Sequence, residues 1–176
     1  MPTTDNSTAN QFETGPTASN GPPPEASSMV QVRVIGQYIK DLLFKSPNIT
    51  ELLSGTPGSP NLKLEINVNA IQTGPDIYES AIDFKANATA DIGAIYKFEM
   101  IYAAMFKIEN VPQPSMEPML LVNCPMLLFP FMRRIVADMT REAGFPPLLL
   151  DPVDFGALYM RKRERASALL AAVAAQ

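Results

Sequence analysis

Hydrophobic and polar residues alternate along three stretches of the chain. In residues 62–70, "LKLEINVNA", every second residue is apolar and the residues between them are charged or carry amides. Aromatic, aliphatic and alanine side chains recur with the same period through residues 77–90 and again through residues 95–108. A period of two is typical of a β-strand with one buried face, so we predict a strand in each stretch.

A further strand is predicted within residues 29–45. Three valines alternate there with polar residues, but the last valine is followed directly by Ile35, which indicates a bend or bulge near Gly36. Residues 46–61 are rich in Pro and Gly and predict an irregular connection with a short apolar turn. Short turns join the other three strands, so the natural sheet is an antiparallel meander.

The second half of the chain changes to a helical period. From Pro125 onward, apolar residues recur every three or four positions, and Gly144 is placed to end this helix. Pro130 lies inside the segment and predicts a kink or an offset start. A second helix is expected from Asp151, a good N-cap followed by a proline. We therefore predict an α+β fold: a four-stranded antiparallel sheet followed by two main helices.

Residues 118–132, "PMLLVNCPMLLFPFM", form an uncharged run within this second half. Three readings are open: a membrane segment, a core helix, or apolar surface kept for contact with another molecule. The run is shorter than the roughly 20 residues needed to cross a bilayer, and it contains three prolines. Stable membrane insertion is therefore the weakest of the three readings.

Residues 1–28 are rich in Pro, Gly, Ser, Thr and Asn and contain one aromatic residue, Phe12. Such a segment buries too little apolar area to offset its ordering entropy, which predicts a disordered N-terminal tail. The segment begins without a positively charged or an apolar stretch, so no secretory signal is expected. We predict a soluble, cytoplasmic protein.

Composition and charge favour a binding protein over an enzyme. The formal net charge is −4, and no basic cluster precedes the C-terminal segment, which argues against a nucleic-acid binder. The chain has no histidine, so it lacks the commonest general base and metal ligand. No glycine-rich phosphate loop is present, and we interpret the lone Cys124 as a small buried residue. We expect no catalytic residues, no metal and no cofactor.

One charged segment has two readings. The basic run "RKRER", residues 161–165, can contact an anionic partner, or it can be the solvated face of a terminal helix. The solvated face is the commoner case and is the reading that we prefer.

Two well-separated segments resemble the SecB family of bacterial export chaperones. One is residues 123–160, "NCPMLLFPFMRRIVADMTREAGFPPLLLDPVDFGALYM", and the other is residues 32–48, "VRVIGQYIKDLLFKSPN". The resemblance covers roughly residues 30–162. It implies a SecB-like domain over residues 29–162, with residues 163–176 as a C-terminal helix extension or tail. It also implies a homotetramer, built as a dimer of dimers, in which the uncharged run is a helix buried between subunits.

The resemblance also implies a function: to hold unfolded precursor proteins without ATP, keep them competent for translocation, and deliver them to the SecA motor. Asp41 and Glu99 match acidic residues on the family's SecA-facing sheet surface. Lys45 stands where the family often has an acid, and Lys97 where it has an apolar residue. This surface is therefore expected to be less negative than the family pattern. The basic, alanine-rich C-terminal segment also departs from that pattern.

A holding chaperone needs apolar surface that accepts many sequences, because apolar contact is non-directional. Our candidates for a client-binding groove lie on the second strand, in the connection before it and around the last helix: Ile49, Leu52, Leu53, Leu62, Leu64, Ile66, Leu149, Phe155 and Tyr159. For each of them a place in the core is an equally good interpretation. Phe98, Met100 and Tyr102 align with the family's dimer-to-dimer contact and are predicted to help set the tetramer. The alternative function is an oligomeric adaptor that binds one folded partner through the same groove.

Overall fold

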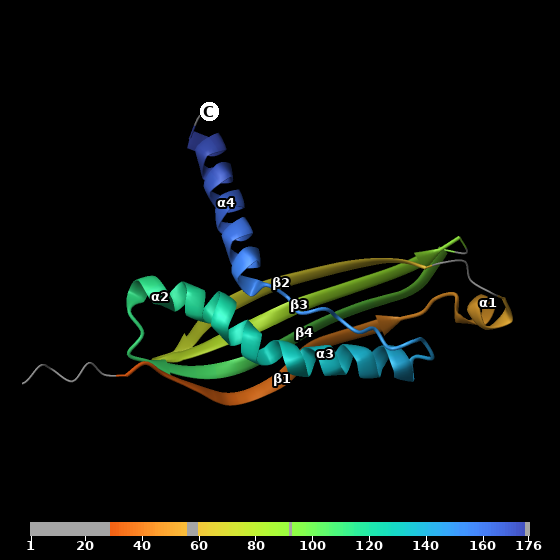
Figure 1. Ribbon diagram of the computed structural model, residues 1–176, viewed down its shortest axis with the longest axis horizontal. Helices are drawn as coiled ribbons and strands as arrows, with labels where there is room; N and C mark the ends of the chain where they lie inside the picture. Colours follow the sequence, from red (N-terminus) through yellow and green to blue (C-terminus); the bar gives the residue numbers. More distant parts are fainter. Residues whose placement is uncertain (1–28, 56–59, 92, 175–176) are drawn as a thin grey trace, which may run out of the picture.

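The fold is a four-stranded antiparallel sheet with helices packed on one of its faces (Figure 1). The computed structural model describes residues 29–55, 60–91 and 93–174. Its elements are, in chain order, β1 (Gln31–Lys45), α1 (Ile49–Ser54), β2 (Asn61–Gly74), β3 (Ile77–Ala90), β4 (Gly93–Glu109), α2 (Gln113–Pro118), the π-helical segment η1 (Met119–Asn123), α3 (Cys124–Glu142) and α4 (Phe155–Ala174). The strand order is β1-β4-β3-β2, so the predicted α+β fold is confirmed. The tail predicted over residues 1–28 lies outside the described residues.

The register of the sheet explains the alternating sequence. Leu42 of β1, Met100 of β4, Phe84 of β3 and Ile66 of β2 lie side by side in one row across all the strands. Phe84 is 0% exposed and Met100 is 1% exposed, because this row faces the helices. We call this side of the sheet the helix face. The opposite side, which includes Glu99, is called the open face below.

Strand β1 changes register twice. The first shift lies between Val34 and Gly36, where the sequence predicted a bulge. The second lies between Ile39 and Asp41 and was not predicted. Each bulge inserts one unpaired residue and resets which side chains face the helices. As a result, the apolar residues at the C-terminal end of β1 reach the core, whereas Asp41 opposes Ile101 on the open face.

The main helical segment begins earlier than the periodicity predicted. Helix α2 starts at Gln113, and η1 leads directly into α3, so the chain is helical from Gln113 to Glu142 rather than from Pro125. Pro125 lies in the first turn of α3, as predicted. Gly144 adopts a φ of 87°, and its N–H donates to the carbonyl of Arg141 at 3.0 Å, so glycine ends this helix as predicted.

The uncharged run is both core and open surface. By length and hydropathy the stretch Gln113–Glu142 is long and apolar enough to cross a membrane. Its inner side chains, however, pack on the sheet of the same chain, as in the core helix of a soluble protein: Leu120, Cys124, Leu128, Phe129 and Met132 are buried. On the outer side, Met126, Leu127 and Phe131 are 58%, 51% and 50% exposed. We call these three residues the outer patch of α3.

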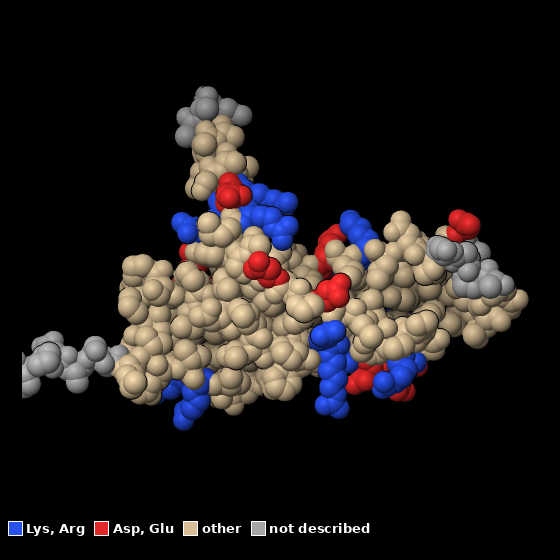
Figure 2. Space-filling view, viewed as in Figure 1, with Lys and Arg blue, Asp and Glu red and all other residues tan. Residues whose placement is uncertain are grey.

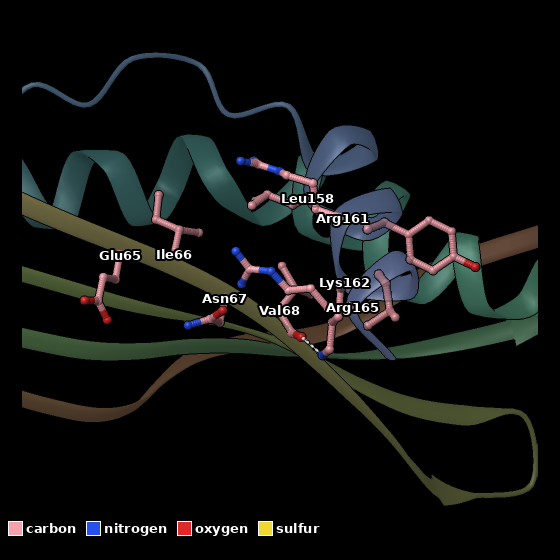
Figure 3. Close-up of a pocket in the computed structure, with 10 residues that line it drawn as sticks. Glu65, Ile66, Asn67, Val68, Leu158, Arg161, Lys162 and Arg165 are labelled. Atoms are coloured by element: carbon pink, nitrogen blue, oxygen red, sulfur yellow. Dashed lines mark hydrogen bonds between the residues drawn. The ribbon is translucent and has the colours of Figure 1, made fainter. Parts of the chain in front are cut away.

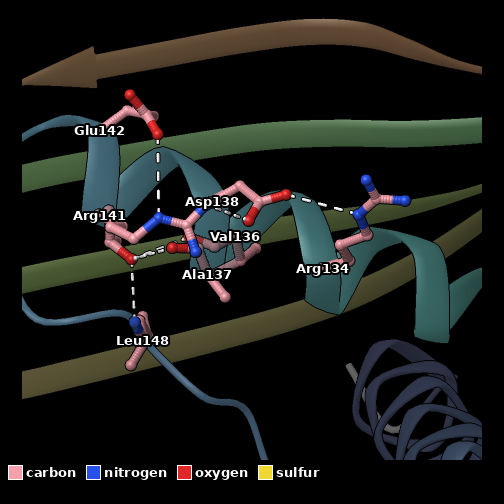
Figure 4. A network of polar contacts seen from close by, with 8 residues as sticks. Arg134, Val136, Ala137, Asp138, Arg141, Glu142 and Leu148 are labelled. Carbon is pink, nitrogen blue, oxygen red and sulfur yellow. Dashed lines mark hydrogen bonds and ion pairs between the residues drawn. The ribbon is translucent and has the colours of Figure 1, made fainter.

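The link from α3 to α4 is fixed by the last turns of α3 (Figure 4). The buried hydroxyl of Thr140 accepts the N–H of Leu148 at 2.9 Å and donates to the carbonyl of Val136 at 3.0 Å. On the outer side, Asp138 accepts a hydrogen bond from Arg141 at 2.8 Å. The link therefore leaves α3 in a fixed direction and carries the chain to α4.

Helix α4 starts later than predicted. Its N-cap is Asp154, whose Oδ1 accepts the N–H of Ala157 at 2.9 Å, and not Asp151. The residues from Pro146 to Asp154 form no regular secondary structure, and the helix begins at Phe155. Past its first turns α4 projects away from the body of the molecule (Figure 1).

A buried carboxylate on the open face holds the edge strand β1. Glu79 of β3 accepts a hydrogen bond from the hydroxyl of Tyr38 and another from Nζ of Lys40 at 2.7 Å. The hydrogen bond from Lys40, and next that from Tyr38, lowers the pKa of Glu79. The hydrogen bond to Glu79, with smaller contributions from burial and from the negative charge, raises the pKa of Tyr38 from 10.0 to about 12.

We expect the substitution Tyr38→Phe to lower the free energy of unfolding by about 1 kcal/mol at about pH 8, a value reduced for the partial exposure of the ring. The pKa of Tyr38 is higher in the folded protein than in the unfolded chain. The hydrogen bond from Tyr38 to Glu79 therefore contributes its full stabilisation below about pH 10, and this stabilisation is lost as the pH approaches 12. Urea unfolding of both proteins at one protein concentration measures the difference. A difference that is the same at about pH 8 and about pH 12 would contradict the assignment.

Candidate functional site

A cavity of about 430 Å³ opens between the edge strand β2 and the first turns of α4 (Figure 3). We call it the groove. It is lined by Glu65, Ile66, Asn67, Val68, Leu121, Leu158, Tyr159, Arg161, Lys162 and Arg165. Its lining is apolar where the helix face of β2 meets η1 and α4, and it is basic along α4. The groove therefore combines an apolar floor with a cationic wall.

Contacts with α3, α2 and β2 hold helix α4 in place beside β2. The Phe155 ring packs edge-on against Phe129 of α3, with ring centroids 5.8 Å apart and planes at 74°. The hydroxyl of Tyr159 donates to Oε2 of Glu117 at 3.1 Å, which ties α4 to α2. Nζ of Lys162 donates to the carbonyl of Val68 at 3.0 Å. Because Val68 lies on an edge strand, this bond also covers one of the carbonyl groups at the sheet edge.

Two of the predicted client-binding residues line the groove, namely Ile66 and Tyr159. Leu62 and Leu64 lie on the same face of β2 and are 39% and 42% exposed, so they extend the apolar surface from the groove along the strand. Leu149, in the link before α4, is 68% exposed but does not line the groove.

The other predicted client residues are placed differently. Phe155 is 2% exposed because it anchors α4 in the core, so it supports the groove from beneath instead of lining it. Ile49, Leu52 and Leu53 lie on α1, at the far end of the molecule from α4 (Figure 1). Of these, Leu52 packs against the core and Leu53 is 81% exposed. Within one protomer, the structure does not bring α1 and α4 together around one groove.

The basic wall of the groove was not predicted from the sequence. Residues 161–165 were interpreted from their charge alone, without regard to how they are spaced around a helix. Leu158, Arg161, Lys162 and Arg165 are spaced at i, i+3, i+4 and i+7, which places them on one side of a helix. That spacing is visible in the sequence. Figure 2 shows the result, with Lys and Arg side chains gathered where α4 leaves the body of the molecule.

The three residues predicted at the dimer-to-dimer contact need a correction. Phe98, Met100 and Tyr102 are 0%, 1% and 5% exposed in the single chain. They lie on the helix face and belong to the protomer's own core, beneath its own helices. Direct contact with a second dimer is therefore not available to them. The exposed apolar residues nearest to this description are those of the outer patch of α3.

The two residues predicted to bind SecA share the open face. Asp41 is exposed, and Glu99 lies one strand away on β4. Nζ of Lys97 is 2.7 Å from Oε1 of Glu99, and this hydrogen bond lowers the pKa of the Glu99 carboxyl, with smaller effects from Lys85 and Lys45. Lysines thus largely compensate the charge of Glu99. This agrees with the expectation from Lys45 and Lys97 that this surface is less negative than the family pattern.

The described residues include no candidate metal site and no reactive cysteine. No group of three or more His, Cys, Asp or Glu side chains that could bind a metal ion occurs among them. Cys124 is 0% exposed, as predicted, and burial raises the pKa of its thiol to about 12. A thiol of this kind stays protonated at neutral pH and is a poor nucleophile.

Comparison with known proteins agrees with this arrangement. A family model described as "Preprotein translocase subunit SecB" matches residues 25–166. A protein-export protein SecB from Rhodopseudomonas palustris (strain BisA53) is 43% identical over 152 residues, which are 86% of this chain and 94% of that protein. Another from Nitrobacter hamburgensis is 40% identical over 153 residues, covering 87% of this chain and 96% of that protein.

A solved structure supports the fold. A SecB-like chaperone from Mycobacterium tuberculosis, in complex with a peptide from an antitoxin, superposes with a TM-score of 0.55. The two chains are 14% identical, and the match covers 69% of this chain and 90% of that one. With these matches along most of its length, the chain belongs to the SecB family of protein-export chaperones.

Proposed function

We propose that the protein is an ATP-independent holding chaperone that binds unfolded precursor proteins in the cytoplasm, keeps them competent for translocation and delivers them to SecA. The observation that carries this proposal is the apolar surface left open beside α4. The groove floor at Ile66 and Val68 continues along β2 to Leu64 and Leu62, both about two fifths exposed. An extended, non-native segment can lie along this surface, whereas a folded protein hides such segments.

The free energies of burial and of ordering explain why the binding of a client stays reversible. Burial of about 400 Å² of client apolar area gains roughly 10 kcal/mol at about 25 cal/mol per Å². Ordering and immobilising the client removes much of this gain, so one groove binds weakly. Grooves repeated in an oligomer raise the effective concentration of later contacts, so a long chain is held while each contact still exchanges.

Two open apolar surfaces support the assembly into a dimer of dimers. The outer patch of α3 is one. The other is the edge strand β1, where Val34, Ile35 and Ile39 are 43%, 53% and 45% exposed, and whose outer edge pairs with no strand among the described residues. Unpaired edge strands and exposed apolar patches are typical of interfaces between subunits. A dimer of dimers requires two kinds of contact between subunits, one within each dimer and one between the dimers. We assign the outer patch of α3 to one of these contacts and the edge strand β1 to the other.

We assign the contact with SecA to the open face of the sheet. Because Lys97 compensates Glu99, the acidic side chains of this face that form no ion pair among the described residues include Asp41 and Asp83, which lie on either side of Ile101. The contribution of Glu99 is expected to depend on whether Lys97 moves away when SecA binds.

A refolding assay tests the function. A slowly folding precursor is diluted from denaturant with the protein in stoichiometric amounts and without nucleotide. Refolding should be arrested, and addition of SecA should release the arrested precursor. Several unrelated unfolded precursors should compete with one another for the protein. If unfolded precursors neither slow their refolding nor compete, the protein is not a holding chaperone, and the adaptor that binds one folded partner becomes the better assignment.

A further inference from the structure

We infer that the outer end of α4 is a membrane-docking element, which binds reversibly to the surface of an anionic lipid bilayer. The element has two parts: a basic collar, residues 161–165, and an apolar tip, residues 166–173. This lipid contact is separate from the proposed holding of clients and does not depend on it.

The apolar tip is exposed on every side. Residues 166–173, "ASALLAAV", carry no charge, and all of them are exposed. The side chains of Leu169, Leu170 and Val173 are 68%, 71% and 68% exposed. Figure 1 shows this part of α4 projecting away from the body of the molecule. A helix that docks on a protein through one face keeps its other faces polar, whereas this tip is uncharged all round. The tip therefore fits an apolar medium better than a single protein surface.

The basic collar lies directly before the tip. Residues 161–165, "RKRER", contain four basic residues and one acid, so their local formal charge is +3. Arg161, Arg163 and Arg165 are exposed and take part in none of the ion pairs within the part of the chain that the structure describes. The guanidinium of Arg163 lies 5.6 Å from the ring centroid of Tyr159, a contact that leaves its charge in place. Figure 2 shows Lys and Arg side chains around the base of α4 and uncharged surface farther along it.

The order of collar and tip matches the layers of a bilayer. At about 1.5 Å per residue the tip is about 12 Å long, much shorter than the hydrocarbon core of about 30 Å. The tip is thus too short to span a membrane, but its apolar side chains can enter the boundary between headgroups and acyl chains. The collar then lies among the phosphate groups, which guanidinium groups bind through paired, charge-assisted hydrogen bonds. Such a contact is peripheral and reversible.

The formal net charge of −4 does not prevent this contact. Charges more than about 10 Å apart are largely screened at physiological ionic strength. Acidic residues such as Asp41 and Asp83 lie on the open face of the sheet, whereas α4 leaves from the side that the helices cover (Figure 1). The charge nearest to a surface that meets the tip is therefore that of the collar.

A second copy of α4 is a poorer occupant of the tip. Parallel pairing of two α4 helices brings two collars of like charge together, and antiparallel pairing sets each collar against an apolar tip. An anionic bilayer instead offers phosphate groups to the collar and hydrocarbon to the tip.

Binding to protein-free lipid vesicles tests the inference. We expect the protein to sediment with phosphatidylglycerol vesicles at low ionic strength, to bind phosphatidylcholine vesicles about tenfold more weakly or less, and to be released as salt is added. The variant Arg163→Gln, Arg165→Gln should weaken binding to phosphatidylglycerol about 25-fold, since each basic residue near an anionic surface contributes about fivefold. The control Arg33→Gln, Lys107→Gln removes the same charge from the open face of the sheet and should leave the binding unchanged.

A tryptophan on the tip gives a second measurement. The chain contains no tryptophan, so Leu170→Trp places a single indole fluorophore there. Its emission should move to shorter wavelength when phosphatidylglycerol vesicles are added. The emission of Thr89→Trp, at an exposed position near the end of β3, should not move.

Several results would overturn the inference. They are absence of vesicle binding, equal binding to the two lipids, undiminished binding of the arginine variant, or an emission of Leu170→Trp that moves no more than that of Thr89→Trp. Light scattering tests the alternative occupant. If Leu169→Gln, Leu170→Gln yields a smaller particle that binds vesicles as the unmodified protein does, the tip is an interface between copies and the inference fails. The arrest of precursor refolding is measured without lipid, so its outcome is independent of these results.

Discussion

Replacing Met100 by aspartate is expected to unfold the protomer, whereas replacing Phe131 by glutamate is expected to break the assembly and leave the protomer folded. Met100 is 1% exposed in a row of apolar side chains that crosses the whole sheet. A carboxylate at this position is buried without a partner, which costs several kcal/mol. The total stability of a domain is about 5–15 kcal/mol, so most or all of it would be lost.

The ring of Phe131 is half exposed and lies beside Leu127 on the outer patch of α3. A glutamate there remains hydrated in the isolated protomer, so the fold should persist. Between two subunits the same carboxylate is desolvated without a partner, which penalises the contact that buries the outer patch. We expect Phe131→Glu to yield a smaller particle at micromolar concentration.

Light scattering and circular dichroism together measure both effects. The control Thr89→Glu adds the same charge at an exposed position near the end of β3 and should leave the particle mass and the circular dichroism unchanged. If Phe131→Glu keeps the mass of the unmodified protein, the outer patch of α3 is not an assembly contact. If Met100→Asp gives a folded dimer, the original assignment of Met100 to the dimer-to-dimer contact is restored.

The strands could be predicted from the sequence because burial differs between the two faces of the sheet. Phe84 and Met100 face the helices, whereas Glu99 faces the open side, and this difference produces a period of two. The second bulge of β1, between Ile39 and Asp41, could not be predicted because much of β1 is exposed on both sides in the single chain. Where neither face of a strand is buried, apolar and polar residues need not alternate, so the sequence does not indicate where the register shifts.

The helix start at Gln113 was missed for a different reason. Prolines and a glutamate interrupt the apolar period before Pro125, and η1 changes the number of residues per turn there. A pattern search that assumes a regular α-helix therefore begins too late.

The candidate site could be predicted only in part. Ile66 and Tyr159 were found because groove residues are apolar, but the same criterion selected Phe155, which is core, and residues of α1, which lie elsewhere. The assignment of Met100 failed similarly. An apolar strand face can be covered by a helix of its own chain or by another subunit, and this choice depends on tertiary packing.

Replacing Phe155 by alanine is expected to lower the free energy of unfolding by about 3–5 kcal/mol, because a fully buried ring is removed from a closely packed site. Its ring closes the contact between α4 and Phe129, and α4 forms one wall of the groove. Hydrogen exchange of α4 should therefore accelerate, and arrest of precursor refolding should weaken. Met29→Ala is the control, since this side chain is exposed, is not a predicted client contact, and should change stability by less than about 0.5 kcal/mol. If Phe155→Ala keeps the urea midpoint of the unmodified protein and only precursor arrest is lost, Phe155 contacts clients directly, and its place beneath the groove is wrong.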